Sequence, residues 1–148
     1  MPGKYRGAHS QALLFGAFFN GGGTSADDVQ AYLQLGRYST DPRGTVEVGG
    51  FLYYQGQFFG NVDLGPINVG EPVMVELLWD QPNHRFVACL WRPTMGIFAE
   101  QYMPYSMSDV TAAASPFQGL SSNVFPVNCT GSRRFAEEEV SFDNLSTN

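Results

Sequence analysis

Positive charge is scarce in this sequence. Its 148 residues include 8 lysines and arginines against 14 aspartates and glutamates, which gives a net charge of −6, and Lys4 is the single lysine. Proteins that bind a nucleic-acid backbone do so through a basic patch that displaces counterions. We therefore expect no nucleic-acid partner.

Long apolar runs are also lacking. No stretch approaches the roughly 18 apolar residues of a membrane-spanning helix, and residues 1–6 hold no apolar segment of the kind found in a signal peptide. We expect a soluble chain that does not insert into a membrane. Two locations stay open: extracellular or periplasmic if the chain is cut from a secreted protein, and cytoplasmic otherwise.

Metal-binding and nucleophile motifs are missing as well. Cys89 and Cys129 are the only cysteines, and neither the His and Cys spacings of zinc sites nor a G-x-S-x-G nucleophile motif occurs. We expect no cofactor, with calcium as the alternative at Asp27, Asp28 and Asp143. With two cysteines in the sequence, Cys89 is expected to be either a buried thiol or one half of a disulfide.

What the sequence does have is β-strand patterning, clearest between Val69 and Pro93. Residues 73–79 and 85–91 are rich in β-branched and aromatic side chains, and residues 80–84 supply turn chemistry between them. Because side chains alternate along a strand, Val75, Leu77 and Trp79 share one face, which we expect in the core. His84 in the turn could pair with Asp80, but an exposed turn histidine without a chemical role is the favoured interpretation.

Further strands are predicted along the rest of the chain. Residues 29–38 alternate strictly between apolar and polar side chains, which indicates a strand with one buried and one open face. The remaining predicted strands cover residues 12–20, 45–48, 51–63, 97–102 and 135–145. Gly49-Gly50 is interpreted as a break between strands, and residues 108–114 as a possible short helix.

These elements predict an all-β fold, a two-sheet antiparallel β-sandwich, with a closed barrel as the alternative. A length of 148 residues fits a single domain that buries about 70% of its unfolded surface. Residues 1–11 are expected to be a loosely ordered lead-in to that domain.

Several short motifs carry a family resemblance. They are Leu-Gly-Pro-Ile at 64–67, Val69-Gly70, Trp79-Asp80, the strand at 86–90 and Val-Ser-Phe-Asp-Asn-Leu at 140–145. In this layout the chain from Ala12 to Leu145 resembles the concanavalin A-like lectin/glucanase superfamily, including laminin G-like domains. The resemblance implies a jelly-roll sandwich with carbohydrate or protein ligands.

The open strand faces supply the candidate ligand site. Tyrosine rings can cover the C–H faces of sugars and glutamine amides can bind their hydroxyls. The candidate ligand-binding residues are Gln30, Tyr32, Gln34, Tyr53, Gln55, Gln57, Glu76, Trp91 and Tyr102, with Phe59 expected beside Tyr53. The alternative is that these side chains form ordinary cross-strand pairs or pack under the segment 94–130.

Three functions follow from these observations. The first is a carbohydrate-binding or recognition module without catalytic activity, whose partner is a glycan or polysaccharide. The second is a glycan-processing hydrolase or lyase that uses carboxylates from different strands, with Glu47, Glu76 and Asp80 as candidates; within one strand Glu76 and Asp80 lie about 13 Å apart, too far for a glycosidase pair. The third is a structural protein-interaction module, which includes self-association.

Overall fold

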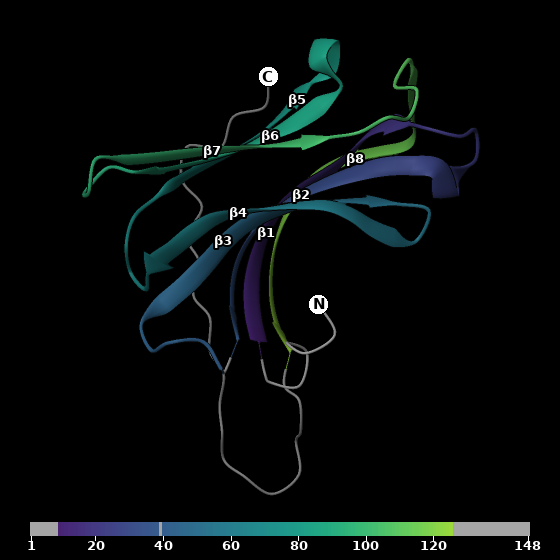
Figure 1. Ribbon diagram of the computed structural model, residues 1–148. Helices are drawn as coiled ribbons and strands as arrows, with labels where there is room; N and C mark the ends of the chain where they lie inside the picture. Colours follow the sequence, from purple (N-terminus) through teal and green to yellow (C-terminus); the bar gives the residue numbers. More distant parts are fainter. Residues whose placement is uncertain (1–8, 39, 126–148) are drawn as a thin grey trace, which may run out of the picture.

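The protein is described by a computed structural model over residues 9–38 and 40–125, and it is built almost wholly of β-strands in two antiparallel sheets. The five-stranded sheet contains β1 (His9–Asn20), β2 (Asp28–Tyr38), β3 (Thr45–Tyr54), β4 (Gln57–Asn68) and β8 (Thr111–Phe125). The three-stranded sheet contains β5 (Met74–Asp80), β6 (Arg85–Arg92) and β7 (Ile97–Pro104). The two sheets form the two layers seen in Figure 1, which confirms the predicted sandwich.

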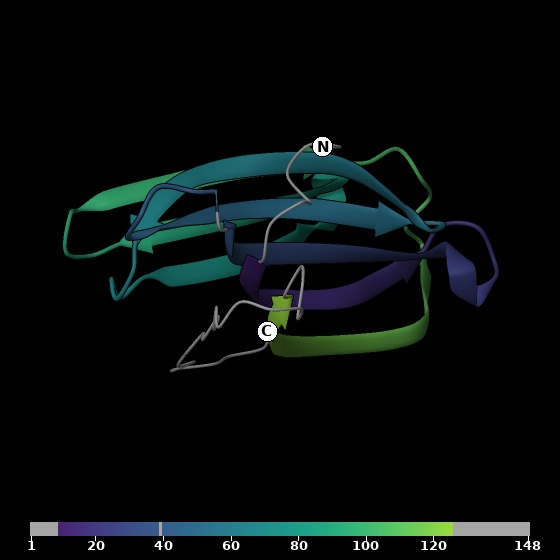
Figure 2. The ribbon, with the colours of Figure 1, turned by 90° about the horizontal axis from the view of Figure 1, so that it is seen from below.

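The strand order shows how the layers are connected. It is β4-β3-β2-β1-β8 in one sheet and β5-β6-β7 in the other, so every neighbouring pair except β1–β8 is consecutive in sequence. Figure 2 shows the strands of the larger sheet side by side, with β8 next to β1. Short connections favour such antiparallel neighbours. The described strands therefore form a four-stranded meander followed by a three-stranded one, and β8 returns to pair with β1 at the edge of the first. A jelly roll contains two Greek keys instead.

The core lies between the sheets and follows the predicted alternation. Val29, Ala31 and Leu33 on β2 are fully buried, and Leu77 and Trp79 on β5 pack against the same core. Gln34 and Glu76 point away from it on the outward sides of their strands. The assignment of the inner faces of β2 and β5 is thus confirmed.

The core is sealed at one end by aromatic rings. Phe19 stacks on Trp79 with ring centroids 5.4 Å apart, and it contacts Tyr105 at 4.8 Å. Phe86 packs against Phe18 at 4.9 Å. These rings come from β1, β5, β6 and the segment after β7, so they tie both sheets together.

Two predicted boundaries near the start and middle of the chain are wrong. β1 begins at His9, inside the predicted lead-in 1–11, because His9–Gln11 gain ladder partners on both β2 and β8. Gly49 and Gly50 lie inside β3 and do not break it. A Cβ on Gly49 would lie 2.7 Å from the Val62 carbonyl oxygen, so this glycine marks close backbone approach.

The predicted strand 51–63 is in fact a hairpin. Its turn is Gln55-Gly56, where both residues have positive φ, as a two-residue type I′ turn requires. Residues 111–125 form β8, not a helix, because pairing with β1 at residues 111–112 and 117–125 overrides the helical preference of three alanines. The predicted closing strand 135–145 lies outside the described residues.

Candidate functional site

The outward side of the five-stranded sheet, which we call the aromatic face, carries a row of aromatic rings that crosses every strand. Phe15 stacks on Tyr32 with centroids 5.5 Å apart and planes within 3°, and Tyr32 stacks on Phe51 at 4.7 Å. The row continues edge-on to Phe117 at one end and to Phe58 at the other, with 5.5 Å and 5.2 Å between centroids. Tyr53 also meets Phe58, at 5.2 Å.

Strand register explains why these rings meet. Phe15, Tyr32 and Phe51 are direct cross-strand partners on β1, β2 and β3, where side chains lie closest. Gly119 on β8 is the partner of Phe15, and the Phe15 ring fills the space that a Cβ at position 119 would need. The sequence pattern of each strand fixes its own face, whereas the row depends on register between strands.

Glutamine amides lie along the same row. The Tyr32 hydroxyl donates to Gln30 Oε1, and Gln34 Nε2 donates to Gln11 Oε1 at 3.0 Å. Burial raises the pKa of Tyr32, and the nearby Tyr53 adds to this effect. The structure therefore brings four predicted site residues onto one face: Gln30, Tyr32, Gln34 and Tyr53.

Three residues predicted to join them lie elsewhere, because the β3–β4 turn was missed. Gln55 sits in the turn and donates from Nε2 to Asp27 Oδ1 at 2.6 Å. Gln57 is paired with Tyr54, so it belongs to the side of β3 opposite to Tyr53. Phe59 packs against Tyr54 and the core, and Phe58 takes the outward place expected for it.

Four aromatic members of the row were not predicted as site residues: Phe15, Phe51, Phe58 and Phe117. For Phe51 a signal was present, since it alternates with Tyr53 on the same strand. Phe58 could be placed only once the turn at Gln55-Gly56 was known. Phe15 required the pairing of β1 with β2, and Phe117 that of β8 with β1.

Three other predicted residues, Glu76, Trp91 and Tyr102, lie on the outward side of the three-stranded sheet, which we call the acidic face. Register arranges this face in rows: Leu78-Val87-Tyr102, then Glu76-Cys89-Glu100, then Met74-Trp91-Phe98. The predicted ligand residues are thus divided between the outer sides of two different layers. Alternation assigns a face within a strand but not the sheet to which the strand belongs.

The middle row of the acidic face surrounds a buried free thiol. Cys89 Sγ lies 4.0 Å from Glu100 Oε2, and the Tyr102 hydroxyl donates to the other oxygen of Glu100. Burial raises the pKa of Cys89, with further contributions from Glu100 and Glu76. Glu100 was not predicted as a site residue, although it alternates with Tyr102 on the predicted strand 97–102.

The candidate catalytic carboxylates do not converge. Glu47 lies on the outward side of the larger sheet, whereas Glu76 and Asp80 lie on β5 in the smaller one. Asp80 accepts from Arg85 Nε at 2.6 Å and from Asn83, so both its oxygens are engaged. Its pKa is lowered, chiefly by Arg85.

His84 pairs with Asp109 instead of Asp80. His84 Nδ1 lies 2.9 Å from Asp109 Oδ2, which also accepts from the Tyr105 hydroxyl at 2.6 Å. Trp79 Nε1 donates to the Tyr105 oxygen at 2.8 Å, and the pKa of Tyr105 is raised to about 12, mainly by burial. This chain of contacts fastens the β5–β6 turn to the segment after β7.

Asp27 and Asp28, the proposed calcium ligands, are engaged by protein donors. Asp28 accepts from the backbone N–H groups of Ala114 and Ser115 at 2.7 and 2.8 Å, and Asp27 accepts from Thr24 and Gln55. Hydrogen bonds lower the pKa of Asp27, that of Gln55 most. Over residues 9–38 and 40–125, no three or more His, Cys, Asp or Glu side chains group as metal ligands. Asp143 lies outside these residues.

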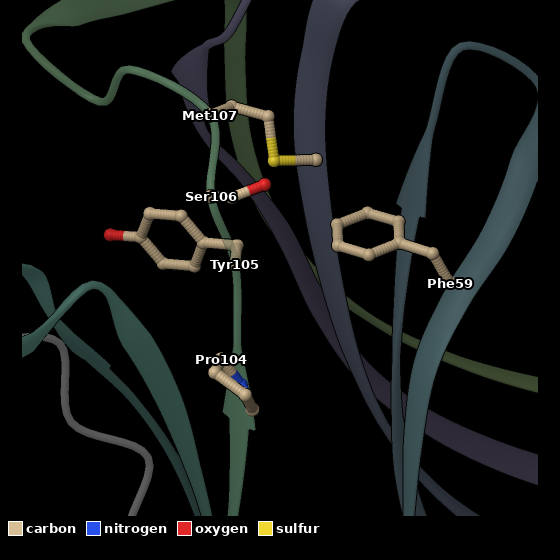
Figure 3. A pocket seen from close by; sticks show the side chains of 5 residues that line it. All are labelled: Phe59, Pro104, Tyr105, Ser106 and Met107. Carbon is tan, nitrogen blue, oxygen red and sulfur yellow. The ribbon is translucent and has the colours of Figure 1, made fainter.

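A shallow apolar hollow opens between the layers at the edge formed by β4 and β7. It has a volume of about 350 Å³ and is lined by Phe59 and by Pro104 to Met107, which face each other in Figure 3. The Tyr105 hydroxyl points away from it toward Asp109. The hollow therefore offers apolar surface with few hydrogen-bonding groups.

In the part of the chain that the structure describes, no helix is long and apolar enough to cross a membrane. No protein-family model, no curated protein and no solved structure matches the chain.

Proposed function

We propose that the protein is a carbohydrate-binding recognition module without catalytic activity, and that its ligand lies on the aromatic face. The observation that carries this proposal is the continuous aromatic row flanked by glutamine amides. Aromatic rings bury the apolar faces of sugars, and amides donate and accept hydrogen bonds with hydroxyls. Such a face meets both requirements of sugar recognition.

The β3–β4 end of the row is the best place for a sugar ring. The inner rings of the row stack on each other, which occupies their faces. Phe58 at the edge is 67% exposed, so most of its surface is open to a ligand. Tyr53 and Gln30 are cross-strand partners close to it and supply polar groups.

The ligand that fits this face is a neutral glycan. The outward positions of β8, β1 and β2 that pair across the row carry no charged side chain, from Gln11 to Ala17, from Gln30 to Gln34 and from Phe117 to Asn123. Those of β3 and β4 carry the carboxylates Glu47 and Asp63 and no cation. An anionic sugar would find no cation there to balance its charge. Neutral hydroxyls need only the amides and tyrosines already present.

A glycan array followed by affinity electrophoresis tests the proposal. We expect a neutral polysaccharide to retard the wild-type chain, and Phe58→Ala to abolish the retardation by removing the stacking ring. The matched control is Phe98→Ala, since Phe98 is 56% exposed on the acidic face. If no glycan is retained, or if both variants lose binding equally, the proposal is wrong.

A second candidate is an interaction module in which the aromatic face packs on a second copy of the chain. Its size favours this: five strands of about ten residues span about 24 Å by about 33 Å, near the 800 Å² per partner of a standard interface. Light scattering distinguishes the two, because a monomer at every concentration removes this candidate.

A further inference from the structure

The acidic face has two carboxylates placed between apolar rows. Glu76 and Glu100 flank Cys89 from the two neighbouring strands, so their backbones lie about 10 Å apart. The rows on either side end in side chains that are well exposed: Met74 and Phe98 in one, Leu78 and Tyr102 in the other. A cationic side chain above Cys89 would reach both carboxylates and have apolar contacts on both sides.

The charge of this row is not balanced within the described residues. Glu76 has no hydrogen bond or ion pair to another described residue, and Glu100 accepts hydrogen bonds from Tyr102 and Cys89. Arg85 brings one cation to this face, with its guanidinium 4.0 Å from the centroid of the Tyr102 ring. The other carboxylates of this sheet and its flanks are paired, Asp80 with Arg85 and Glu71 with Arg92. Because Asp80 already engages Arg85, the two carboxylates of the row still exceed the positive charge on this face, and the face attracts a further cation.

The dimensions of the face limit the kind of partner. Three strands with three rows cover about 14 Å by about 20 Å, well below the 800 Å² per partner of a stable globular interface. A second copy of the chain would also bring a net charge of −6 to a negative surface. A short extended segment fits both the area and the charge.

We propose that the acidic face binds an extended peptide segment of the pattern apolar-x-Lys/Arg-x-apolar. Rows on one face of a sheet are two residues apart, about 6.8 Å, which equals the spacing of residues i and i+2 in an extended peptide. The cation then lies over the Glu76-Cys89-Glu100 row while its apolar neighbours lie over the rows on either side. Such a site recognises its partner through charge and spacing together.

Fluorescence polarisation with two labelled peptides tests this assignment. The probes are acetyl-Leu-Ser-Lys-Ser-Leu-amide and the same peptide with Gln in place of Lys. We expect the lysine peptide to bind about tenfold more tightly, because its ammonium group forms two partly exposed ion pairs that the glutamine peptide lacks. In a Cys129→Ser background the bound peptide should also slow alkylation of Cys89, which lies beneath it.

The double variant Glu76→Gln and Glu100→Gln should remove the preference for lysine, while Glu47→Gln, which takes a carboxylate from the other sheet, should preserve it. Urea unfolding of each variant confirms that it is folded. Equal binding of the two peptides, or equal loss in Glu47→Gln, would overturn the proposal. If butylamine binds as tightly as the lysine peptide, the proposal is also overturned, because the leucines of the peptide would then contribute nothing to binding.

Discussion

The two outer faces of this sandwich differ in where their carboxylates lie relative to the aromatic rings. The aromatic face carries Phe15, Tyr32 and Phe51 in direct contact across strands, and the outward positions of β8, β1 and β2 that pair across the row have no charged side chain. Its carboxylates, Glu47 and Asp63, lie on β3 and β4 outside the row. The acidic face also exposes aromatic rings, but Glu76 and Glu100 interrupt them. One layer thus offers surface to a neutral ligand and the other to a cationic one.

This difference shows that exposure alone does not define a binding surface. Phe58 and Phe98 are the same residue type with similar exposure, yet one continues a stack of rings and the other adjoins a row of carboxylates. The neighbours of each ring decide which ligand its surface fits.

The largest expected effect on stability comes from truncating a side chain on the inner side of a sheet, compared with one on the outer side. Leu33→Ala should lower the free energy of unfolding by about 2–5 kcal/mol, because Leu33 is fully buried and its removal leaves a cavity. Leu78→Ala on the acidic face should cost less than about 1 kcal/mol, since Leu78 already meets solvent. Urea unfolding measures both, and equal costs would contradict the assignment of faces.

A somewhat smaller effect is expected from Gly49→Ala on β3. The new Cβ would lie 2.7 Å from the Val62 carbonyl oxygen, so two strands of the larger sheet must move apart, at about 1–3 kcal/mol. Gly44→Ser is the control, because a Cβ at position 44 would have no neighbouring atom to clash with. Any cost there comes from the backbone, whose φ is 79°. A Gly49→Ala chain as stable as the wild type would mean that β3 and β4 are less closely paired.

A pH titration tests the ion pair between Glu71 and Arg92 at the flank of the smaller sheet. Hydrogen bonds from Arg92 lower the pKa of Glu71 from 4.5 to about 2. Because the folded pKa lies below the unfolded one, this pair stabilises the protein above about pH 4.5, and the stabilisation is lost as pH falls toward 2. Glu71→Gln should flatten the loss of stability in that range. Thermal melts between pH 2 and 6 provide the measurement.

The smallest expected effect concerns the amides of the aromatic face. Gln34→Ala removes one hydrogen bond to Gln11 on a half-open surface, so it should change stability by less than about 1 kcal/mol. If it costs as much as Leu33→Ala, the outward side of β2 is packed as tightly as its inward side, and a ligand could not reach it.

The fold was predictable where single strands carry strong patterns. Alternation in β2 and in the β5–β6 hairpin gave the correct inner faces, because burial of one side dictates the residue types there. Two predictions were wrong. The turn at Gln55-Gly56 was missed because glutamine occupies a position usually taken by Asn or Asp, and part of β8 was predicted as a helix because it contains a run of alanines.

The candidate site was only half predictable for a related reason. Four of the predicted ligand residues do share the aromatic face, since β2 and β3 are neighbours and each strand showed its own alternation. Glu76, Trp91 and Tyr102 were grouped with them although they belong to the other layer. Which strands share a sheet is decided by long-range pairing, which no local pattern records.

The most direct test of the account is a titration of the ¹⁵N-labelled chain with the neutral glycan retained on the array, followed by two-dimensional amide NMR. We predict shifts concentrated at Gln30, Tyr32, Tyr53 and Phe58 on the larger sheet, and none along β6. Shifts concentrated at Cys89, Trp91 and Tyr102 would contradict the account, because they would place the sugar on the acidic face.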